Sequence, residues 1–241
     1  MNNQYDDPSF FQAYNEMPRS QKGLMAAGEW PQFVSMLPDL KDKTILDLGC
    51  GYGWHCIYAA KQNARHVVGI DASHRMIDQA IKMHSHPNIV YQVCDLTKYV
   101  YPIEQFDVVI SNLVLHYIED LDVIYQNIYR TLKSSGIFVM NIEHPTFTAG
   151  IHEDWIYDKQ GNALYWPVDQ YYYPGQRKTL FLGKTVYKQH HTLTQIVNGL
   201  LKQGFILETL QEVMPPKEWL VQKEMKDEMR RPMMLLIRVK K

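Results

Sequence analysis

The sequence predicts an α/β protein in which helices cover a doubly wound, mostly parallel sheet. The first observation is that short apolar segments, typical of buried strands, alternate with helical segments between residues 44 and 142. The second is that the alternation returns later, with a helix expected at 192–203 and strands at 205–213 and 233–239. With the five strands expected before residue 142, the sheet has seven strands.

The composition indicates one domain and argues against several classes of protein. The chain has 241 residues, of which 46% are apolar, which suffices for a full core. Its formal net charge is −1 and it has no long basic run, which argues against nucleic-acid binding. Three cysteines without a C-x-x-C pair predict buried, reduced thiols. We find neither a signal pattern nor an apolar run long enough for a membrane span, and we expect a cytoplasmic protein.

The first expected strand, 44–48, leads into three glycines at alternate positions, Gly49, Gly51 and Gly53. A helix is expected soon after them, at 56–62. Because glycine has no Cβ and tolerates positive φ, such a segment can bring backbone N–H groups close to a ligand. The simpler alternative is a tight turn where a helix packs on a sheet.

A second strand, 66–71, ends in Asp71, about twenty residues after the glycines, where a carboxylate can accept hydrogen bonds from ribose hydroxyls. This arrangement suits any cofactor that contains a nucleoside. However, the spacing G-x-G-x-G differs from the G-x-G-x-x-G of dinucleotide sites, and Asp47 stands just before it. An acidic residue there would repel a pyrophosphate, whereas it suits a ligand that carries an ammonium and a sulfonium.

With Asp47-x-Gly49-x-Gly51-x-Gly53 followed by Asp71, the region from about 45 to about 145 resembles the class I S-adenosylmethionine-dependent methyltransferases, of the small-molecule, type 11-like kind. The resemblance implies a Rossmann-like fold with a terminal antiparallel hairpin, which dinucleotide-binding domains lack. It also implies S-adenosyl-L-methionine as cofactor and direct in-line displacement of its methyl group by a small-molecule acceptor. The alternatives are a non-catalytic relative that binds the cofactor or a metabolite, and an NAD-dependent oxidoreductase.

The resemblance further implies which residues bind the cofactor. Met76, in the helix expected at 73–83, would wall the adenine, although it could instead be a core residue. After the third strand, Asp95 would accept from the adenine amino group and the Leu96 N–H would complete base recognition, although Asp95 could instead cap a turn. The full expected set is Asp47, Gly49, Cys50, Gly51, Gly53, Asp71, Ala72, Met76, Asp95, Leu96, Asn112, Tyr14 and Arg19.

Residues 1–40 precede the first strand and have the pattern of an arm of short helices rich in aromatic side chains. In many related enzymes such an arm folds over the cofactor. This implies that Tyr14 and Arg19 contact the methionine end, with Arg19 as the charge partner of its carboxylate. Alternatively, the aromatic side chains only pack the arm on the domain.

Two further strands, 104–113 and 137–142, deliver side chains to the carboxyl edge of the sheet, where open α/β sheets bind their ligands. A general base is needed only if the acceptor arrives protonated, and histidine has a suitable pKa. We prefer His144, because it follows the fifth strand, and then His116. Each candidate could instead be a hydrogen-bonding wall or a surface residue. The four candidates are His144, His116, His190 and His191.

Residues 146–190 show no helical period and hold many aromatic residues separated by Gly and Pro. We expect an inserted cap, partly a hairpin, over the edge of the sheet, because functional loops commonly lie on a rigid scaffold. Tyr117, Trp155 and Tyr165 are expected to line an acceptor pocket there. A satellite core under a long loop is the alternative.

The expected organisation is a single methyltransferase domain of four parts. These are a helical arm at 1–40, a cofactor-binding core at 41–145, the cap at 146–190, and a final helix with two strands at 191–241. We expect no metal site and no contact with nucleic acid or membrane. The protein is expected to be a monomer or a homodimer.

Overall fold

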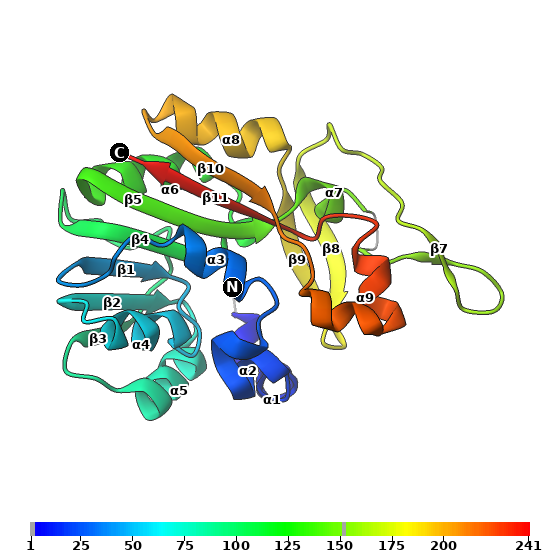
Figure 1. The fold of residues 1–241 in the computed structure, drawn as a ribbon, viewed down its shortest axis with the longest axis horizontal. Coiled ribbons are helices and arrows are strands. Elements are labelled where there is room, and N and C mark those ends of the chain that lie inside the picture. The colour runs from blue at the N-terminus through cyan, green and yellow to red at the C-terminus, as the bar shows by residue number, and fades with distance from the viewer. Residues whose placement is uncertain (1–2, 151–152) are drawn as a thin grey trace.

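The computed structural model describes residues 3–150 and 153–241, and its largest element is a seven-stranded sheet (Figure 1). The strand order is β10-β11-β5-β4-β1-β2-β3. The first five strands pair in parallel, whereas β11 runs antiparallel to both β5 and β10. The predicted mostly parallel sheet with a terminal antiparallel hairpin is therefore confirmed. The strands are β1 (Thr44–Leu48), β2 (His66–Asp71), β3 (Ile89–Val93), β4 (Phe106–Asn112), β5 (Leu132–Glu143), β10 (Ile206–Glu212) and β11 (Met234–Lys240).

The order of the strands reverses at β1, whose neighbours are β2 on one side and β4 on the other. In an open parallel sheet, ligands bind outside the carboxyl ends of the strands at such a reversal. Leu48 of β1 is in register with Ile70 of β2 and Ser111 of β4, so the three strands end at one edge. The glycine loop, 49–53, begins at this edge.

Helices cover both faces of the sheet, because successive residues of a strand point to opposite faces. In β1, Ile45 packs in the apolar cluster with α3, α4 and α5, whereas Leu46 packs in the cluster with α6 and α8. Both of these side chains are fully buried. The helices are α3 (Trp30–Met36), α4 (Trp54–Lys61), α5 (His74–His84), α6 (Leu121–Thr131) and α8 (Leu193–Lys202).

Short helices also form the arm that precedes β1, as predicted. The first α-helix begins at Pro8, because Asp7 Oδ1 accepts hydrogen bonds from the N–H groups of Ser9 and Phe10. The 3₁₀ helix before it packs against α5. The elements of the arm are η1 (Gln4–Asp6), α1 (Pro8–Asn15), α2 (Pro18–Lys22) and η2 (Gly23–Ala26).

The predicted cap consists of two antiparallel hairpins that follow α7 (Pro145–Thr148). The β6–β7 hairpin projects away from the sheet, whereas β8–β9 lies at the end of β5 (Figure 1). Leu182 and Gly183 both have positive φ, as a two-residue hairpin turn requires. The remaining elements are β6 (Ile156–Tyr157), β7 (Ala163–Tyr165), β8 (Gly175–Phe181), β9 (Lys184–His190), η3 (Leu115–Tyr117), η4 (Lys217–Val221) and α9 (Lys223–Glu228).

The largest difference between an expected and an observed boundary is at the start of β5. The helix expected to run to residue 132 ends at Thr131, and β5 begins at Leu132 rather than at residue 137. Leu132 pairs with Phe106 and Ile137 pairs with Val108, so the residues between them form an irregularity in the ladder. An apolar residue such as Leu132, which is fully buried, fits the core face of either a helix or a strand.

The structure also tests the predictions about the cysteines and about membrane spans. All three cysteines are free, and Cys50 and Cys56 are buried, as predicted. Cys94 is half-buried, so the prediction of burial is wrong for this residue, which lies just after the end of β3. Within the described ranges, no helix has both the length and the apolar character needed to cross a membrane.

Candidate functional site

The glycine loop connects β1 to α4 with all three glycines in the left-handed region. Their φ angles are 71° at Gly49, 51° at Gly51 and 75° at Gly53. The loop is held to the end of β2, because the N–H groups of Gly49 and Cys50 both donate to the Ile70 carbonyl, at 2.8 and 2.9 Å. The positive φ angles are by themselves enough reason for glycine at these three positions.

The space around the three glycines differs. A Cβ added at Gly49 would lie 2.3 Å from Val114 Cγ2, and one added at Gly53 would lie 2.3 Å from Tyr91 Oη. A Cβ added at Gly51 would meet no atom within 4 Å. The loop is thus tightly packed at both ends and open at its centre.

Asp71 lies beside this open centre. Its Oδ2 accepts a hydrogen bond from the Gly51 N–H at 3.0 Å, and its Oδ1 accepts one from the Ser73 N–H at 2.9 Å. Burial raises the pKa of this carboxyl to about 6, although the two N–H donors oppose the rise. A carboxylate oxygen can accept more than one hydrogen bond, so Asp71 keeps acceptor positions for a ligand at the loop.

Asp47 is a second carboxyl in this region. It is 1% exposed in β1, and the Cys56 thiol donates to its Oδ2 at 3.3 Å. Burial raises its pKa to about 7, and the negative charge of Asp71 adds to the rise. A cation bound nearby would stabilise the charged form of both carboxyls.

The ends of β2 and β3 lie side by side at the same edge. The Cys94 N–H donates to the Asp71 carbonyl at 2.8 Å, so Asp95 follows directly at this edge. Asp95 Oδ1 accepts from the N–H and the hydroxyl of Thr97, which is the turn role considered as an alternative. Of the other residues expected here, Leu96 and Met76 are buried and Ala72 is exposed.

The N-terminal arm packs on the glycine loop. Tyr14 contacts Tyr52 of the loop edge to face, with ring centroids 5.6 Å apart, and contacts Tyr5 at the same centroid distance. Asp6 Oδ1 accepts from Ser73 Oγ at 2.6 Å, which ties the arm to the start of α5. Sequence reasoning singled out Tyr14 but missed Tyr5 and Asp6, because nothing in a short polar segment signals a contact with residues so far along the chain.

Arg19 and Asn112 are connected by a chain of polar contacts. Arg19 forms an ion pair with Glu29, whose side chain is 4% exposed. Glu29 Oε1 also accepts from Asn112 Nδ2 at 3.5 Å, and Asn112 Oδ1 accepts from Asn141 Nδ2 at 2.8 Å. Asn141 Oδ1 is buried and has no hydrogen-bond partner among the described residues. The sequence did not single out Glu29 or Asn141.

A second group of polar side chains lies at the carboxyl end of β5, next to the β8–β9 hairpin. Lys188 Nζ bridges two carboxylates, at 2.6 Å from Glu143 Oε1 and 2.9 Å from Glu153 Oε2. His116 Nε2 lies 3.8 Å from Glu143 Oε1. None of these four side chains is more than 10% exposed. We call His116, Glu143, Glu153 and Lys188 the buried charge cluster.

The charges of the cluster depend on one another. Burial raises the pKa of Glu143 and of Glu153, while the ammonium of Lys188 opposes the rise. The two carboxylates in turn raise the pKa of Lys188, so the lysine stays charged. Burial and the nearby Lys188 charge lower the pKa of His116 well below its usual value, so its imidazole is neutral at pH 7.

Three atoms of the cluster are buried without a hydrogen-bond partner in the described part of the chain, Glu143 Oε2, Glu153 Oε1 and His116 Nδ1. Most buried polar atoms in folded proteins are paired, so each exception calls for an explanation. The cluster therefore has a formal negative charge when both of its carboxyls are ionised, and its unpaired oxygen and nitrogen atoms can accept hydrogen bonds.

His144, the preferred base, is engaged at both ring nitrogens. Its Nδ1 accepts from the Thr146 N–H at 3.0 Å and thereby caps α7, and its Nε2 lies 3.2 Å from Glu212 Oε1. His190 and His191 also form hydrogen bonds through ring nitrogens. Of the four candidates, His116 is the one whose ring nitrogen is buried without a partner among the residues the structure describes.

Of the three residues expected to line an acceptor pocket, Tyr117 lies beside the buried charge cluster. Its ring centroid is 4.5 Å from that of His116, and its hydroxyl is 3.1 Å from the hydroxyl of Tyr5. Tyr5 in turn contacts Tyr14, which packs on Tyr52 of the glycine loop. The cluster and the glycine loop are therefore joined through Tyr117, Tyr5 and Tyr14.

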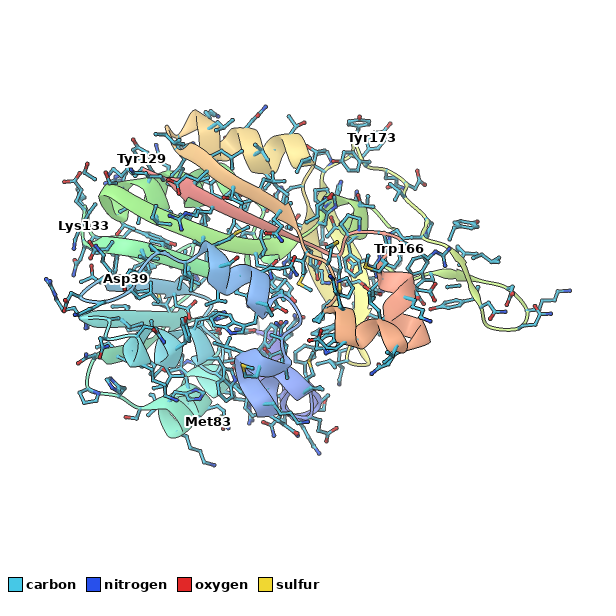
Figure 2. All side chains as sticks on the ribbon, in the orientation of Figure 1. Asp39, Met83, Tyr129, Lys133, Trp166 and Tyr173 are labelled. Carbon is cyan, nitrogen blue, oxygen red and sulfur yellow. The ribbon has the colours of Figure 1, made fainter. Side chains whose placement is uncertain are left out.

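Trp155 and Tyr165 lie elsewhere, on or next to the projecting β6–β7 hairpin. Trp155 packs against Trp166 with ring centroids 5.4 Å apart, and the Arg231 guanidinium lies 4.2 Å from the Trp166 ring. Figure 2 shows Trp166 at the cap end of the molecule, near α9. Tyr165 is 56% exposed. The structure thus brings Tyr117 to the edge of the sheet, holds Trp155 in a separate aromatic group with Trp166, and leaves Tyr165 exposed.

Comparison with known proteins agrees with this geometry. Residues 46–140 match the methyltransferase domain family. A structure from Listeria monocytogenes, assigned to the S-adenosylmethionine-dependent methyltransferases, is 46% identical, with a TM-score of 0.87 over 91% of this chain and 99% of that one. An S-adenosylmethionine-dependent methyltransferase from Mesorhizobium loti is 36% identical, with a TM-score of 0.84 over 91% and 100% of the two chains. An uncharacterized protein of Haemophilus influenzae is 30% identical over the whole of this chain and 99% of its own length.

The fold and the glycine loop define a nucleoside-binding α/β enzyme. The chain belongs to the S-adenosylmethionine-dependent methyltransferases. The predicted enzyme class and the predicted cofactor, S-adenosyl-L-methionine, are confirmed.

Proposed function

We propose that this methyltransferase binds its cofactor along the glycine loop and transfers the methyl group to a small-molecule acceptor beside the buried charge cluster. The observation that carries the proposal is the open centre of the loop. At Gly51 even an added Cβ meets no atom within 4 Å, and the Asp71 carboxylate stands next to this space with acceptor positions to spare. A ribose with two neighbouring hydroxyls suits such a site.

The other expected contacts fit the remaining groups of the cofactor. Asp95 and the Leu96 N–H are suited to the adenine edge, with Met76 as an apolar wall. The polar chain through Asn112 and Arg19 is suited to the charged methionine end, because it offers amide and guanidinium donors. Asp47 adds negative charge, and Tyr14, Cys50, Gly49, Gly53 and Ala72 complete the proposed set.

When bound, S-adenosyl-L-methionine supplies a methyl group on a positively charged sulfur, which an acceptor atom can attack in line. The chain then has to bind, orient and desolvate the reactants, and orientation can supply about 7–11 kcal/mol of the barrier reduction. The arm packs on the glycine loop through Tyr14, and the β8–β9 hairpin encloses the cluster through Lys188. In this proposal, both elements keep water away from the reactants.

A small acceptor is supported by the burial of the cluster and by the net charge of the chain. The cluster is enclosed by the cap, and the whole chain carries a formal net charge of −1, which gives no electrostatic support for binding a nucleic acid. The test is turnover: with the cofactor and a panel of low-molecular-mass metabolites, S-adenosylhomocysteine should accumulate at a rate that depends on the metabolite. Transfer of labelled methyl only to RNA or protein would contradict the proposal.

Replacing Gly51 by alanine is expected to weaken cofactor binding much more than it destabilises the fold. Gly51 and Gly161 both have positive φ and both have open space where a Cβ would lie, so Gly161→Ala is the matched control. Each change costs about 1–2 kcal/mol of stability, because a non-glycine residue is strained in this conformation. Calorimetry should show that only Gly51→Ala weakens the binding of S-adenosyl-L-methionine. Equal affinities in both variants would remove the loop centre from the site.

Cofactor affinity is expected to depend on pH in two steps. Hydroxyls that donate to Asp71 favour its charged form, so affinity should fall as pH drops through about 6, the pKa of the free carboxyl. If Asp47 also stabilises the positive charge of the cofactor, the affinity should begin to fall at a higher pH, as Asp47 becomes protonated near its pKa of about 7. Calorimetry between pH 5 and pH 8 should show that Asp71→Asn removes the lower step and Asp47→Asn the upper one. A flat profile in the unmodified protein would count against both assignments.

His116 and His144 are expected to respond differently to alanine. His116 has a free, neutral ring nitrogen, so His116→Ala should lower the transfer rate by about a hundredfold if the side chain orients or deprotonates the acceptor. His144 caps α7, so His144→Ala should cost about 1 kcal/mol of stability and leave most of the transfer rate. Rates and melting temperatures of the two variants decide between them. A larger rate loss in His144→Ala would restore His144 as the base.

A further inference from the structure

The buried charge cluster has more negative than positive charge. Glu143 and Glu153 are two carboxyls, Lys188 is one ammonium, and the neutral His116 adds no charge, so the buried site has a formal charge of −1 when both carboxyls are ionised. Burying an uncompensated charge is costly unless a partner is supplied. Each carboxylate has one oxygen paired with Lys188 and one without a partner among the described residues, and Glu143 is the one that also lies beside His116, 3.8 Å from its Nε2.

The unpaired atoms of the cluster show what kind of partner is missing. Glu143 Oε2 is an acceptor, and His116 Nδ1 is an acceptor when the Nε2 that faces Glu143 carries the proton. Both residues are buried, so bulk water cannot easily satisfy these atoms. The group that would satisfy the cluster therefore carries N–H or O–H donors and a positive charge.

Among the possible cations, the surroundings favour an organic amine. In residues 3–150 and 153–241 no group of three or more His, Cys, Asp or Glu side chains is placed to hold a metal ion. Two aromatic rings, Phe147 and Phe181, lie with their centroids 5.6 and 6.0 Å from Lys188 Nζ, so π faces that attract cations line the cluster. An anionic acceptor would be repelled, because Lys188 is already neutralised by its two carboxylates.

The cluster is also in the right place for the reaction. Glu143 is the last residue of β5 and His116 lies just after β4, and both strands end at the edge where the glycine loop begins. Tyr117, next to His116, reaches Tyr5 of the arm that packs on that loop. An acceptor at the cluster would thus lie beside the proposed cofactor site.

We propose that the methyl acceptor is a primary or secondary amine whose protonated nitrogen is bound by Glu143 and His116. This inference rests on the proposed function, because it places the acceptor beside the cofactor. The ammonium gives one proton to the Glu143 carboxylate, and the freed nitrogen lone pair forms the new N–CH₃ bond. The S–CH₃ bond breaks with its electron pair left on sulfur, and the products are an N-methylammonium and S-adenosylhomocysteine. Glu143 then returns its proton to water.

The experiment compares acceptors that share a carbon skeleton. Ethanolamine is tested with ethylene glycol and glycolate, and benzylamine with benzyl alcohol and benzoate, using cofactor labelled in its methyl group. We expect label in an amine and in none of the matched alcohols or carboxylates. Label in an alcohol or a carboxylate overturns the inference while the proposed function stands. The inference is also overturned if no amine is methylated and none shifts the melting temperature of the S-adenosylhomocysteine complex.

Substitutions in the cluster test whether it is the site where the amine is methylated. Glu143→Gln keeps the shape of the side chain and removes its charge, so methylation of the amine should fall by about a hundredfold while cofactor affinity is unchanged. Glu208→Gln is the matched control, because Glu208 pairs with Arg238 on the same sheet outside the cluster. If Glu143→Gln does not fold, His116→Gln tests the same pocket. Amine methylation at the unmodified rate in a folded Glu143→Gln variant overturns the inference, whereas loss of cofactor binding in the unmodified protein would overturn the proposed function instead.

Discussion

Replacing Lys188 by methionine is expected to lower the free energy of unfolding by about 3–5 kcal/mol, because it leaves two buried carboxylates without their shared counter-charge. Lys188 lies within 2.9 Å of both Glu143 and Glu153, and its side chain is 6% exposed. Methionine keeps most of the volume, so the loss reports charge rather than packing. Urea unfolding of both proteins measures the difference.

The pH dependence of this loss separates electrostatics from packing. Burial raises the pKa of both carboxyls, so the folded variant binds protons more tightly than the unfolded chain, and its stability should rise as pH falls from 8 to 5. The difference from the unmodified protein should therefore shrink at low pH. Lys202→Met is the control, because the Lys202–Asp122 ion pair is exposed and should contribute little. A loss that is the same at both pH values would mean that packing is responsible.

Replacing Asp71 by alanine is expected to weaken the binding of S-adenosyl-L-methionine by about 1.5–3 kcal/mol, the range for hydrogen bonds to a charged group. This corresponds to about one to two decades in affinity. The expectation follows from the position of the carboxylate beside the open centre of the glycine loop, where it keeps acceptor positions for two ribose hydroxyls. Calorimetry of the folded variant gives the affinity.

The control must separate the ligand contact from the role of Asp71 in holding the loop. Alanine also removes the acceptor of the Gly51 and Ser73 N–H groups, so some loss of stability is expected. Asp71→Asn keeps one acceptor oxygen, so it should lose less cofactor affinity and less stability than Asp71→Ala. Asp78→Ala, an exposed acid on α5, should change neither. Unchanged affinity in a folded Asp71→Ala variant would remove this residue from the cofactor site.

The sequence was sufficient for the parts of the molecule that depend on local rules. Short apolar strands that alternate with helices, three glycines at positive φ and an acid at the end of the next strand are local features, and each is present as predicted. The start of β5 was wrong, because Leu132 fits a buried helix face and a buried strand equally well, and only its pairing with Phe106 decides.

The buried charge cluster could not be predicted in the same way. Lys188 lies 45 residues after Glu143 and 35 residues after Glu153, and a hairpin whose direction the composition does not encode brings it to them. Trp155 and Tyr165 illustrate the reverse problem. The aromatic density of the cap was a sound signal for packing, but it could not tell which side chains face the sheet and which join Trp166 at the cap end.

The central claim is that cofactor and acceptor meet between the glycine loop and the buried charge cluster. A crystal structure of the protein with S-adenosylhomocysteine tests it most directly. We expect both ribose hydroxyls within hydrogen-bond distance of the Asp71 carboxylate, the adenine beside Asp95 and Leu96, and the sulfur on the side that faces His116 and Glu143. A ribose bound away from Asp71, or a sulfur that faces away from the cluster, would contradict the claim.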